Sequence, residues 1–155
     1  MPEGADFESD ALGARYRLKG NKTWISSGEH ELNENIIHLV LAKVPDADGK
    51  LVPGTRGISL FIVPKLKLDA AGNPDKKNML SCGSIEEQMG IHGNSTCVMN
   101  YEEAAGTLLG EANGGLKAMF TMMNEARLGV GLQGLDLSEL RSQNAGPSAR
   151  DRAQE

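Results

Sequence analysis

Hydrophobic residues in this 155-residue chain change their spacing at Gly115. Before that position they occur in short runs between turn residues, and no helical pattern alternates with the runs. Such a series is typical of an antiparallel β-barrel or β-sandwich. After it, apolar residues recur at helical spacing, at Leu116, Met119, Phe120, Met123 and Ala126. We therefore predict a mainly β fold: an antiparallel β-barrel or sandwich domain followed by a C-terminal α-helix.

Individual strands are expected from the same runs. Residues 36–44 are almost continuously apolar, which is typical of a strand covered on both faces. Gly20-Asn21 lies between two alternating segments, 15–19 and 22–26, and predicts a hairpin. Residues 45–50 predict a turn, and residues 65–79 a long exposed loop or irregular hairpin. Further strands are expected at 57–63, ended by Pro64, at 96–101 and at 107–110.

The only tryptophan of the chain, Trp24, is followed by Ile25, two serines and Gly28. A large flat ring beside small hydrogen-bonding side chains suits a planar ligand, because the ring supplies apolar area and the hydroxyls fix orientation. A lone tryptophan is also common in a protein core. The segment alone leaves both interpretations open.

Five segments together resemble the acyl-CoA dehydrogenase family, and they follow in the family's order. Residues 20–28 (GNKTWISSG) resemble its GxKxWITNG signature, and the other four are 55–64 (TRGISLFIVP), 88–96 (QMGIHGNST), 109–116 (LGEANGGL) and 125–131 (EARLGVG). Each segment alone is weak evidence of the resemblance, but five segments in register are specific to the family. The residues of these segments most resemble the large bacterial branch of the family, which includes 3-methylmercaptopropionyl-CoA dehydrogenases.

The resemblance implies a domain organisation. Family members have several hundred residues, in a helical domain, a β domain and a helical bundle. Residues 1–112 would be the middle β domain and residues 113–155 the start of the C-terminal helical domain. The chain therefore resembles a fragment that ends in a helix of an incomplete helical bundle. The apolar face of the helix would seek neighbours, which predicts a homo-oligomer or poor behaviour alone.

The resemblance also implies a chemistry. The family uses FAD to desaturate an acyl-CoA between the α and β carbons, with a Glu as base and the flavin as hydride acceptor. The expected partners are therefore an acyl-CoA substrate and, for the full-length enzyme, an electron-transfer flavoprotein. The protein supplies position, electrostatics and a dry pocket for this chemistry.

Four cofactor contacts are carried over by position. Trp24, Ile25 and Ser26 match the segment that lies along the isoalloxazine ring, with Trp24 over its face and the Ser26 hydroxyl near N5. Arg152 matches the Arg of an ARxRxQFG segment, which reaches the flavin pyrophosphate. Gly146-Pro147 departs from this pattern, and we expect it to interrupt the helix and leave a frayed, solvated tail.

Three substrate contacts are carried over in the same way. Ser9 resembles the end of a TEPxAGSD loop that contacts flavin and substrate. Asn124 and Arg127 match a helix that contacts acyl-CoA, although Arg127 is equally suited to pair with a structural carboxylate. Some relatives carry the catalytic Glu where this chain has Ala126, and the other usual position lies beyond the chain, so we expect no catalytic base here.

Composition excludes several other functions. The net charge of −5 argues against nucleic acid or an anionic membrane surface as a partner. No apolar run spans a bilayer and no signal segment opens the chain, which favours a cytoplasmic protein with two reduced cysteines. No metal-ligand spacing occurs among the three histidines, and we predict no metal. His38 lies in an apolar run and is expected to be a satisfied core residue.

Residues 129–134 match GxGxxG, the dinucleotide fingerprint. That fingerprint requires a preceding strand, whereas these glycines lie within a helical pattern. We expect small residues that allow close helix packing instead.

Two functional classes remain. The chain is a flavin-dependent acyl-CoA dehydrogenase fragment, inactive alone, or a non-catalytic β domain that acts as a binding or assembly module.

Overall fold

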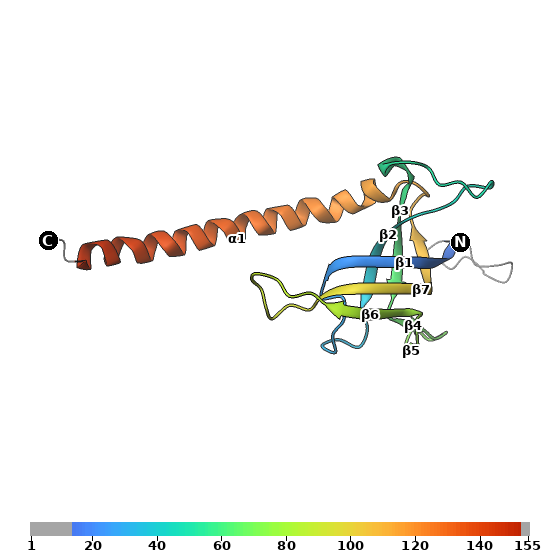
Figure 1. Ribbon diagram of the computed structural model, residues 1–155, viewed down its shortest axis with the longest axis horizontal. Coiled ribbons are helices and arrows are strands. Elements are labelled where there is room, and N and C mark those ends of the chain that lie inside the picture. Colours follow the sequence, from blue (N-terminus) through green and yellow to red (C-terminus); the bar gives the residue numbers. More distant parts are fainter. Residues whose placement is uncertain (1–13, 153–155) are drawn as a thin grey trace. The chain divides into compact units, whose positions relative to one another are not determined.

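The structure, a computed structural model, describes residues 14–152 (Figure 1). The elements in chain order are β1 (Arg15–Ser26), β2 (Ile37–Lys43), the 3₁₀ turn η1 (Thr55–Gly57), β3 (Ile58–Pro64), β4 (Leu66–Leu68), β5 (Pro74–Lys77), β6 (Leu80–Ile85), β7 (Thr96–Leu109) and α1 (Gly115–Asp151). The chain divides into two compact units, of which the first ends at Leu116 and the second begins at Lys117. All the strands belong to the first unit.

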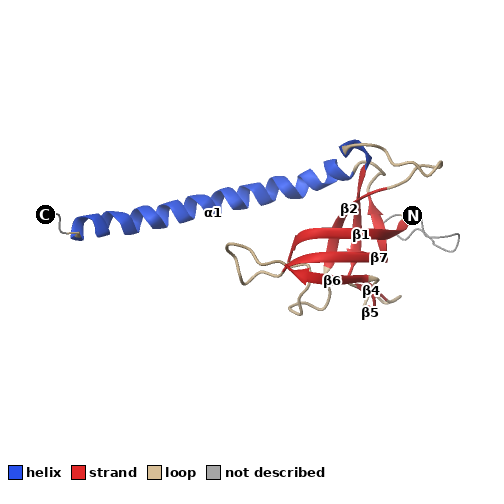
Figure 2. Cartoon of the chain, viewed as in Figure 1, coloured by secondary structure: helices blue, strands red, loops and turns tan. Residues whose placement is uncertain are grey.

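Strand β7 is the centre of the sheet. It pairs antiparallel with β1 on one side, from Thr107 opposite Arg15 to Thr96 opposite Ser26. On its other side β7 pairs with β6 and then with β3, and β2 pairs with β3. The order is therefore β1-β7-β3-β2, with β6 also on β7 and a separate β4–β5 hairpin (Figure 2). This curled antiparallel sheet and the helix after it confirm the predicted fold class.

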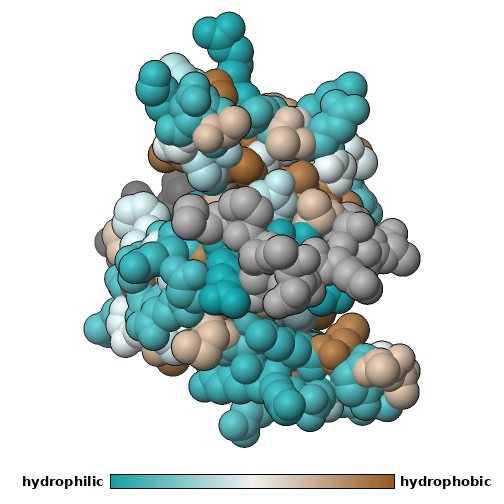
Figure 3. Space-filling model, turned by 90° about the vertical axis from the view of Figure 1, so that its right-hand side faces the viewer, coloured by the Kyte–Doolittle hydropathy of each residue, from teal (hydrophilic) through white to brown (hydrophobic). Residues whose placement is uncertain are grey.

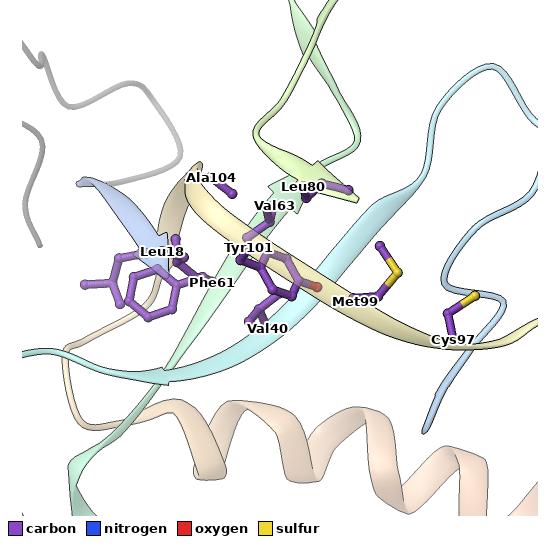
Figure 4. Packing of buried hydrophobic residues seen from close by; sticks show 10 residues of the cluster. Leu18, Val40, Phe61, Val63, Leu80, Cys97, Met99, Tyr101 and Ala104 are labelled. Carbon is purple, nitrogen blue, oxygen red and sulfur yellow. The ribbon is translucent and has the colours of Figure 1, made fainter. Parts of the chain in front are cut away.

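The core lies on the inner face of the curled sheet. Figure 4 shows Val40 of β2, Val63 of β3 and Tyr101 of β7 directed toward one another. Tyr16 packs edge-on against Phe61, with ring centroids 5.4 Å apart. Burial raises the pKa of Tyr101 to about 12, so its phenol stays neutral inside the core.

His38 is also buried, on β2, but it is not the satisfied core histidine that was expected. Its Nε2 atom has no hydrogen-bond partner among the described residues, and its ring faces Tyr101 edge-on at 6.3 Å. Burial lowers the pKa of His38 below its ordinary 6.5; the nearby Glu29 carboxylate raises it and the Lys65 ammonium lowers it, both more weakly. In a charged imidazolium at this position, the Nε2–H group would have no hydrogen-bond acceptor among the described residues.

We expect the fold to lose stability as the pH falls below about 6.5, because the unfolded chain then binds a proton at His38 that the folded chain binds only at lower pH. Urea unfolding at about pH 5, 6 and 7 measures this slope. His38→Leu should flatten it, and the matched control His92→Gln, at an exposed position, should not. An unchanged slope in His38→Leu would contradict the assignment.

The hairpin predicted at Gly20-Asn21 is wrong. Strand β1 continues through both residues, because the long strand β7 offers it an unbroken partner. The side-chain amide of Asn21 donates a hydrogen bond to Asn100 across the pair. Gly20 has a φ of +142°, which glycine adopts readily, so the pair serves an irregular strand and not a turn.

Strand β2 is not covered on both faces, as its continuous apolar run predicted. Its inward residues His38 and Val40 are buried, whereas Ile37 and Leu39 are 53% and 48% exposed. The reason is that an antiparallel sheet commonly packs only one face on the core, so alternate residues of β2 point away from it.

The two strands predicted at 96–101 and 107–110 are the single strand β7. Glu103 lies at a bulge, with a φ of +65°, where Leu18 pairs with Ala104 and Lys19 pairs with Glu102. The bulge absorbs an extra residue without ending the strand. Strand β6 was not predicted, because its residues 80–85 show no clear apolar alternation.

Two hairpin turns share one construction. In each, an aspartate side chain (Asp46 or Asp69) accepts the backbone N–H groups two and four residues later, at 2.8–3.0 Å. Gly49 and Gly72 follow at the same offset with positive φ. The backbone N–H of Asn73 contributes most to holding the pKa of Asp69 below its ordinary value. Residues 65–79 thus form the irregular hairpin that was one of the two expectations.

Helix α1 begins at Gly115, as the change of spacing predicted. At 100° per residue, Met119, Met123 and Val130 lie on one face, and Leu128, Leu132 and Leu135 on the opposite face. A helix that is apolar on opposite faces needs neighbours on both.

The interruption predicted at Gly146-Pro147 is wrong, since α1 continues to Asp151. The proline ring ordinarily clashes with the Cβ of the preceding residue, and Gly146 has none.

The surface is mainly polar on the face drawn in Figure 3, where hydrophobic residues are scattered among hydrophilic ones. Within residues 14–152, no helix is both long and apolar enough to cross a membrane.

Candidate functional site

The end of strand β1 and the residues that follow it, 24–29, form a strained segment that we call the β1 turn. Between Lys22 and Ile25 the strand advances three residues while its partner advances two, from Met99 to Cys97, so the extra residue forms a bulge. Trp24 has a φ of +56°, a left-handed conformation that costs a bulky residue roughly 1–2 kcal/mol. The indole is 71% exposed, so burial of the ring does not offset this cost. Trp24 is therefore not a core residue, and its ring is accessible.

The residues after Trp24 fix the turn to the sheet. Ile25 packs against the core and pairs with Cys97, whereas Ser26 is exposed opposite Thr96. Gly28 is buried, and a Cβ atom there would lie 2.9 Å from the Cβ of Cys97. Only glycine fits this close approach, so the conformation of the turn depends on Gly28.

Hydrogen bonds join this turn to the loop between β6 and β7. The Ser27 hydroxyl donates to Oδ1 of Asn94 at 3.0 Å, and the Asn94 amide nitrogen donates to the Thr96 hydroxyl at 3.1 Å. The Ser95 hydroxyl donates to the backbone carbonyl of Glu29 at 2.9 Å. Two residues of the β6–β7 loop thus hold both ends of the segment 27–29.

An ion pair holds the far end of the same segment. The Lys65 ammonium pairs with the Glu29 carboxylate and also donates to the backbone carbonyl of His30 at 3.3 Å. Lys65 directly follows β3, which lies on the other side of β7 from β1. The ion pair therefore connects the turn to that side of the sheet.

A cavity of about 260 Å³ lies beside the turn. The β6–β7 loop lines it, with Ile91, Asn94 and Thr96 among the residues around it. Two others, of about 430 and 210 Å³, lie between β1 and β2 and contain none of the predicted site residues. Trp24 lines none of these three, so a ligand against its indole would lie on the open surface at the end of the sheet.

The other predicted site residues lie elsewhere in the chain. Asn124 and Arg127 are exposed on α1, in the second unit, and the Arg127 guanidinium lies 5.7 Å from the centre of the Phe120 ring. This cation–π contact is neither of the two pairings considered for Arg127. Arg152 is exposed just after α1. Ser9 lies outside the described residues.

The remaining motifs offer no second site. Residues 129–134 lie inside α1, so no strand precedes GxGxxG as the dinucleotide fingerprint requires. Between residues 14 and 152, no group of three His, Cys, Asp or Glu side chains is placed to hold a metal ion. Cys82 and Cys97 are free thiols, and burial raises the pKa of Cys82.

Known proteins resemble this chain over most of its length. It is 48% identical over 139 residues to 3-methylmercaptopropionyl-CoA dehydrogenase of Ruegeria pomeroyi, which covers 90% of the chain. It is 43% identical over 133 residues to a butyryl-CoA dehydrogenase of Syntrophomonas wolfei, which covers 81%. Over most of its length the chain is thus similar to members of the acyl-CoA dehydrogenase family. It spans 23% and 21% of the length of these two relatives.

The fold agrees with this family. The solved structure of butyryl-CoA dehydrogenase from Megasphaera elsdenii matches 94% of the chain with a TM-score of 0.67 and 24% identity. The match covers 34% of that acyl-CoA dehydrogenase chain. No protein-family profile matches the sequence.

Two residues near the turn were missed from the sequence. Asn94 and Ser95 lie within a segment that resembles the acyl-CoA dehydrogenases, but the sequence suggested no role for them. Their contacts with Ser27 and Glu29 join residues 66 or 67 positions apart. Such contacts depend on the pairing of β1 with β7, which no local pattern reveals.

Proposed function

We propose that this chain is part of a flavin-dependent acyl-CoA dehydrogenase and that its β1 turn contacts the flavin. The single observation that supports this best is the exposed indole of Trp24, in a left-handed backbone, within a segment that resembles the family signature. Strain without burial favours a role outside the fold of this unit. Residues 1–112 would be the middle β domain and residues 113–155 the start of the helical domain.

The donor set of the turn fits FAD. The indole offers a flat apolar face to the isoalloxazine ring, and the exposed Ser26 hydroxyl offers a hydrogen bond to a ring nitrogen. Ile25 would fix the position of both by its packing in the core. The exposed Arg152 guanidinium would reach the flavin pyrophosphate, where a planar cation binds two oxygens.

The substrate would be an acyl-CoA. When bound, the flavin supplies the hydride acceptor for α,β-desaturation of the thioester. Asn124 and Arg127, three residues apart on one face of α1, would contact the acyl-CoA, with Ser9 as a further contact. Ala126 cannot remove a proton, and Glu125 lies about 100° away around the helix. We therefore expect no turnover by the chain alone.

The whole protein would be a homo-oligomer. We propose an electron-transfer flavoprotein as its electron acceptor, as in enzymes of this family. The net charge of −5 gives no support to a nucleic-acid partner.

A flavin titration of the chain tests the proposal. Saturable binding of FAD, followed by a shift of the flavin absorption band, is expected for the unaltered chain. Trp24→Ala should weaken binding about tenfold or more, because it removes the apolar surface under the ring. Leu68→Ala, which removes an exposed apolar side chain on the separate β4–β5 hairpin, is the matched control. Equal affinities for all three proteins, or no saturable binding, would contradict the proposal.

A second function is favoured by the two apolar faces of α1. Leu128 and Leu132 on one face and Val130 on the other are each more than half exposed. Such a helix suits a binding or assembly module that docks between other helices. Concentration-dependent association without flavin binding would favour this second function.

A further inference from the structure

We infer that Asn94 and Ser95 of the β6–β7 loop are positioning residues, which hold the β1 turn so that the Trp24 indole stays outside the core. The inference rests on the proposed function, because it names what prepares the same turn for its planar ligand. Neither residue need touch the flavin.

The turn needs such support because its backbone is strained at two positions. Trp24 and Ser27 have φ values of +56° and +53°, and neither is a glycine. Non-glycine residues stay in this region only where the surrounding structure holds them. The indole does not supply that hold, since most of its surface faces solvent.

Bonds within the turn are weak. The N–H of Gly28 reaches the carbonyl of Ile25 at 3.3 Å, near the limit for a hydrogen bond. Ile25 and Gly28 pack against the core, but the residues between and after them do not. Contacts from other segments therefore hold 27–29, and the ion pair of Lys65 with Glu29 is one of them.

Asn94 and Ser95 provide two more such contacts. Asn94 accepts the Ser27 hydroxyl at 3.0 Å, and Ser95 donates to the Glu29 carbonyl at 2.9 Å. Asn94 is itself fixed, because its amide nitrogen donates to the Thr96 hydroxyl at 3.1 Å. Thr96 is buried and begins β7, directly opposite Ser26.

Asn94 also lines the cavity of about 260 Å³ in the β6–β7 loop. One side chain thus joins the loop to the turn beside Trp24. A loss of order in this loop would change the position of the indole through the hydrogen bonds of Asn94 to Ser27 and of Ser95 to Glu29, without any change in the core.

Asn94→Ala and Ser95→Ala test the inference in the full chain. Trp24 is the only tryptophan, so fluorescence anisotropy excited selectively at the indole, and near-ultraviolet circular dichroism read at the long-wavelength edge beyond the bands of the two tyrosines, report on the surroundings of Trp24. We expect both variants to reduce the anisotropy and the dichroic signal without flavin, and to weaken FAD binding about tenfold. Far-ultraviolet dichroism should stay unchanged, because no strand loses its partner.

Two further variants separate positioning from a general effect on the loop. Ser95→Thr keeps the hydroxyl and should restore the Trp24 signal and the affinity. Ser84→Ala removes a hydroxyl that donates to the Glu86 carboxylate at 3.3 Å, and this change should leave both unchanged.

The outcomes distinguish this inference from the proposed function. If Trp24 loses its signal in both alanine variants while no form of the chain binds FAD, the positioning role stands and the proposed function fails. If FAD binds and both alanine variants retain the affinity and the Trp24 signal, the positioning role is overturned. It is also overturned if Ser95→Thr behaves like Ser95→Ala.

Discussion

Replacing Phe61 with alanine should lower the free energy of unfolding of the β domain by about 3–5 kcal/mol, the range for deleting a buried aromatic ring. Phe61 is 2% exposed, at the centre of β3, between Val40 on β2 and Leu108 on β7. Its loss removes apolar burial and the edge-on contact with Tyr16. Neighbouring strands keep the vacated space open, so a cavity remains.

Urea unfolding followed by Trp24 fluorescence measures this loss, since the only tryptophan lies in the β domain. Phe120→Ala is the matched control, because that ring is 44% exposed on α1 and should matter little to the β domain. A loss below about 1 kcal/mol in Phe61→Ala would contradict the packing described for the sheet.

Gly115→Ala should be the second large effect, with a loss of about 1–3 kcal/mol in the β domain, typical of overpacking. A Cβ atom at Gly115 would lie 2.4 Å from the carbonyl carbon of Ser59 and 2.5 Å from the backbone nitrogen of Leu60. Backbone atoms of β3 cannot move aside as a flexible side chain does. The nearby hydrogen bond from Asn113 to the Ser59 hydroxyl, 2.8 Å long, would be strained as well.

A glycine-to-alanine substitution farther along α1 should instead raise the stability of the helix. Gly129→Ala meets no atom within 4 Å, and alanine favours a helix over glycine by about 1 kcal/mol. Thermal unfolding of the two variants compares them directly. Similar stability of Gly115→Ala and the unaltered chain would show that the start of α1 does not pack against β3.

The sequence predicted the class of fold because its two hydrophobic periods are local. Alternating or apolar runs indicated β2 and β3, and helical spacing indicated α1 from Gly115 onward. The hairpin prediction at Gly20-Asn21 was wrong because pairing with a long partner strand outweighs a local turn signal. Strand β7 provides that pairing along all of β1. Pairing between residues about 80 positions apart has no local signature.

The candidate site was predictable in part for the same reason. Trp24 and Ser26 lie in one short segment, so a family signature could point to them. The strain at Trp24 and the contacts of Asn94 and Ser95 arise only once β1 meets β7 through a bulge. His38 shows the same limit: its apolar surroundings predicted burial, but its unpartnered Nε2 depends on the packing of the strands around it.

The central claim is that the Trp24 indole lies against the ring of a bound flavin. Nuclear Overhauser effects between the indole protons and the methyl groups of the flavin ring, in the full chain with FAD, test it most directly. With one tryptophan in the chain, their assignment is unambiguous. We expect such effects, and we expect Asn94→Ala to weaken them. Contacts from the flavin methyl groups only to Tyr16 and Phe61, beside the cavity between β1 and β2, would contradict the claim.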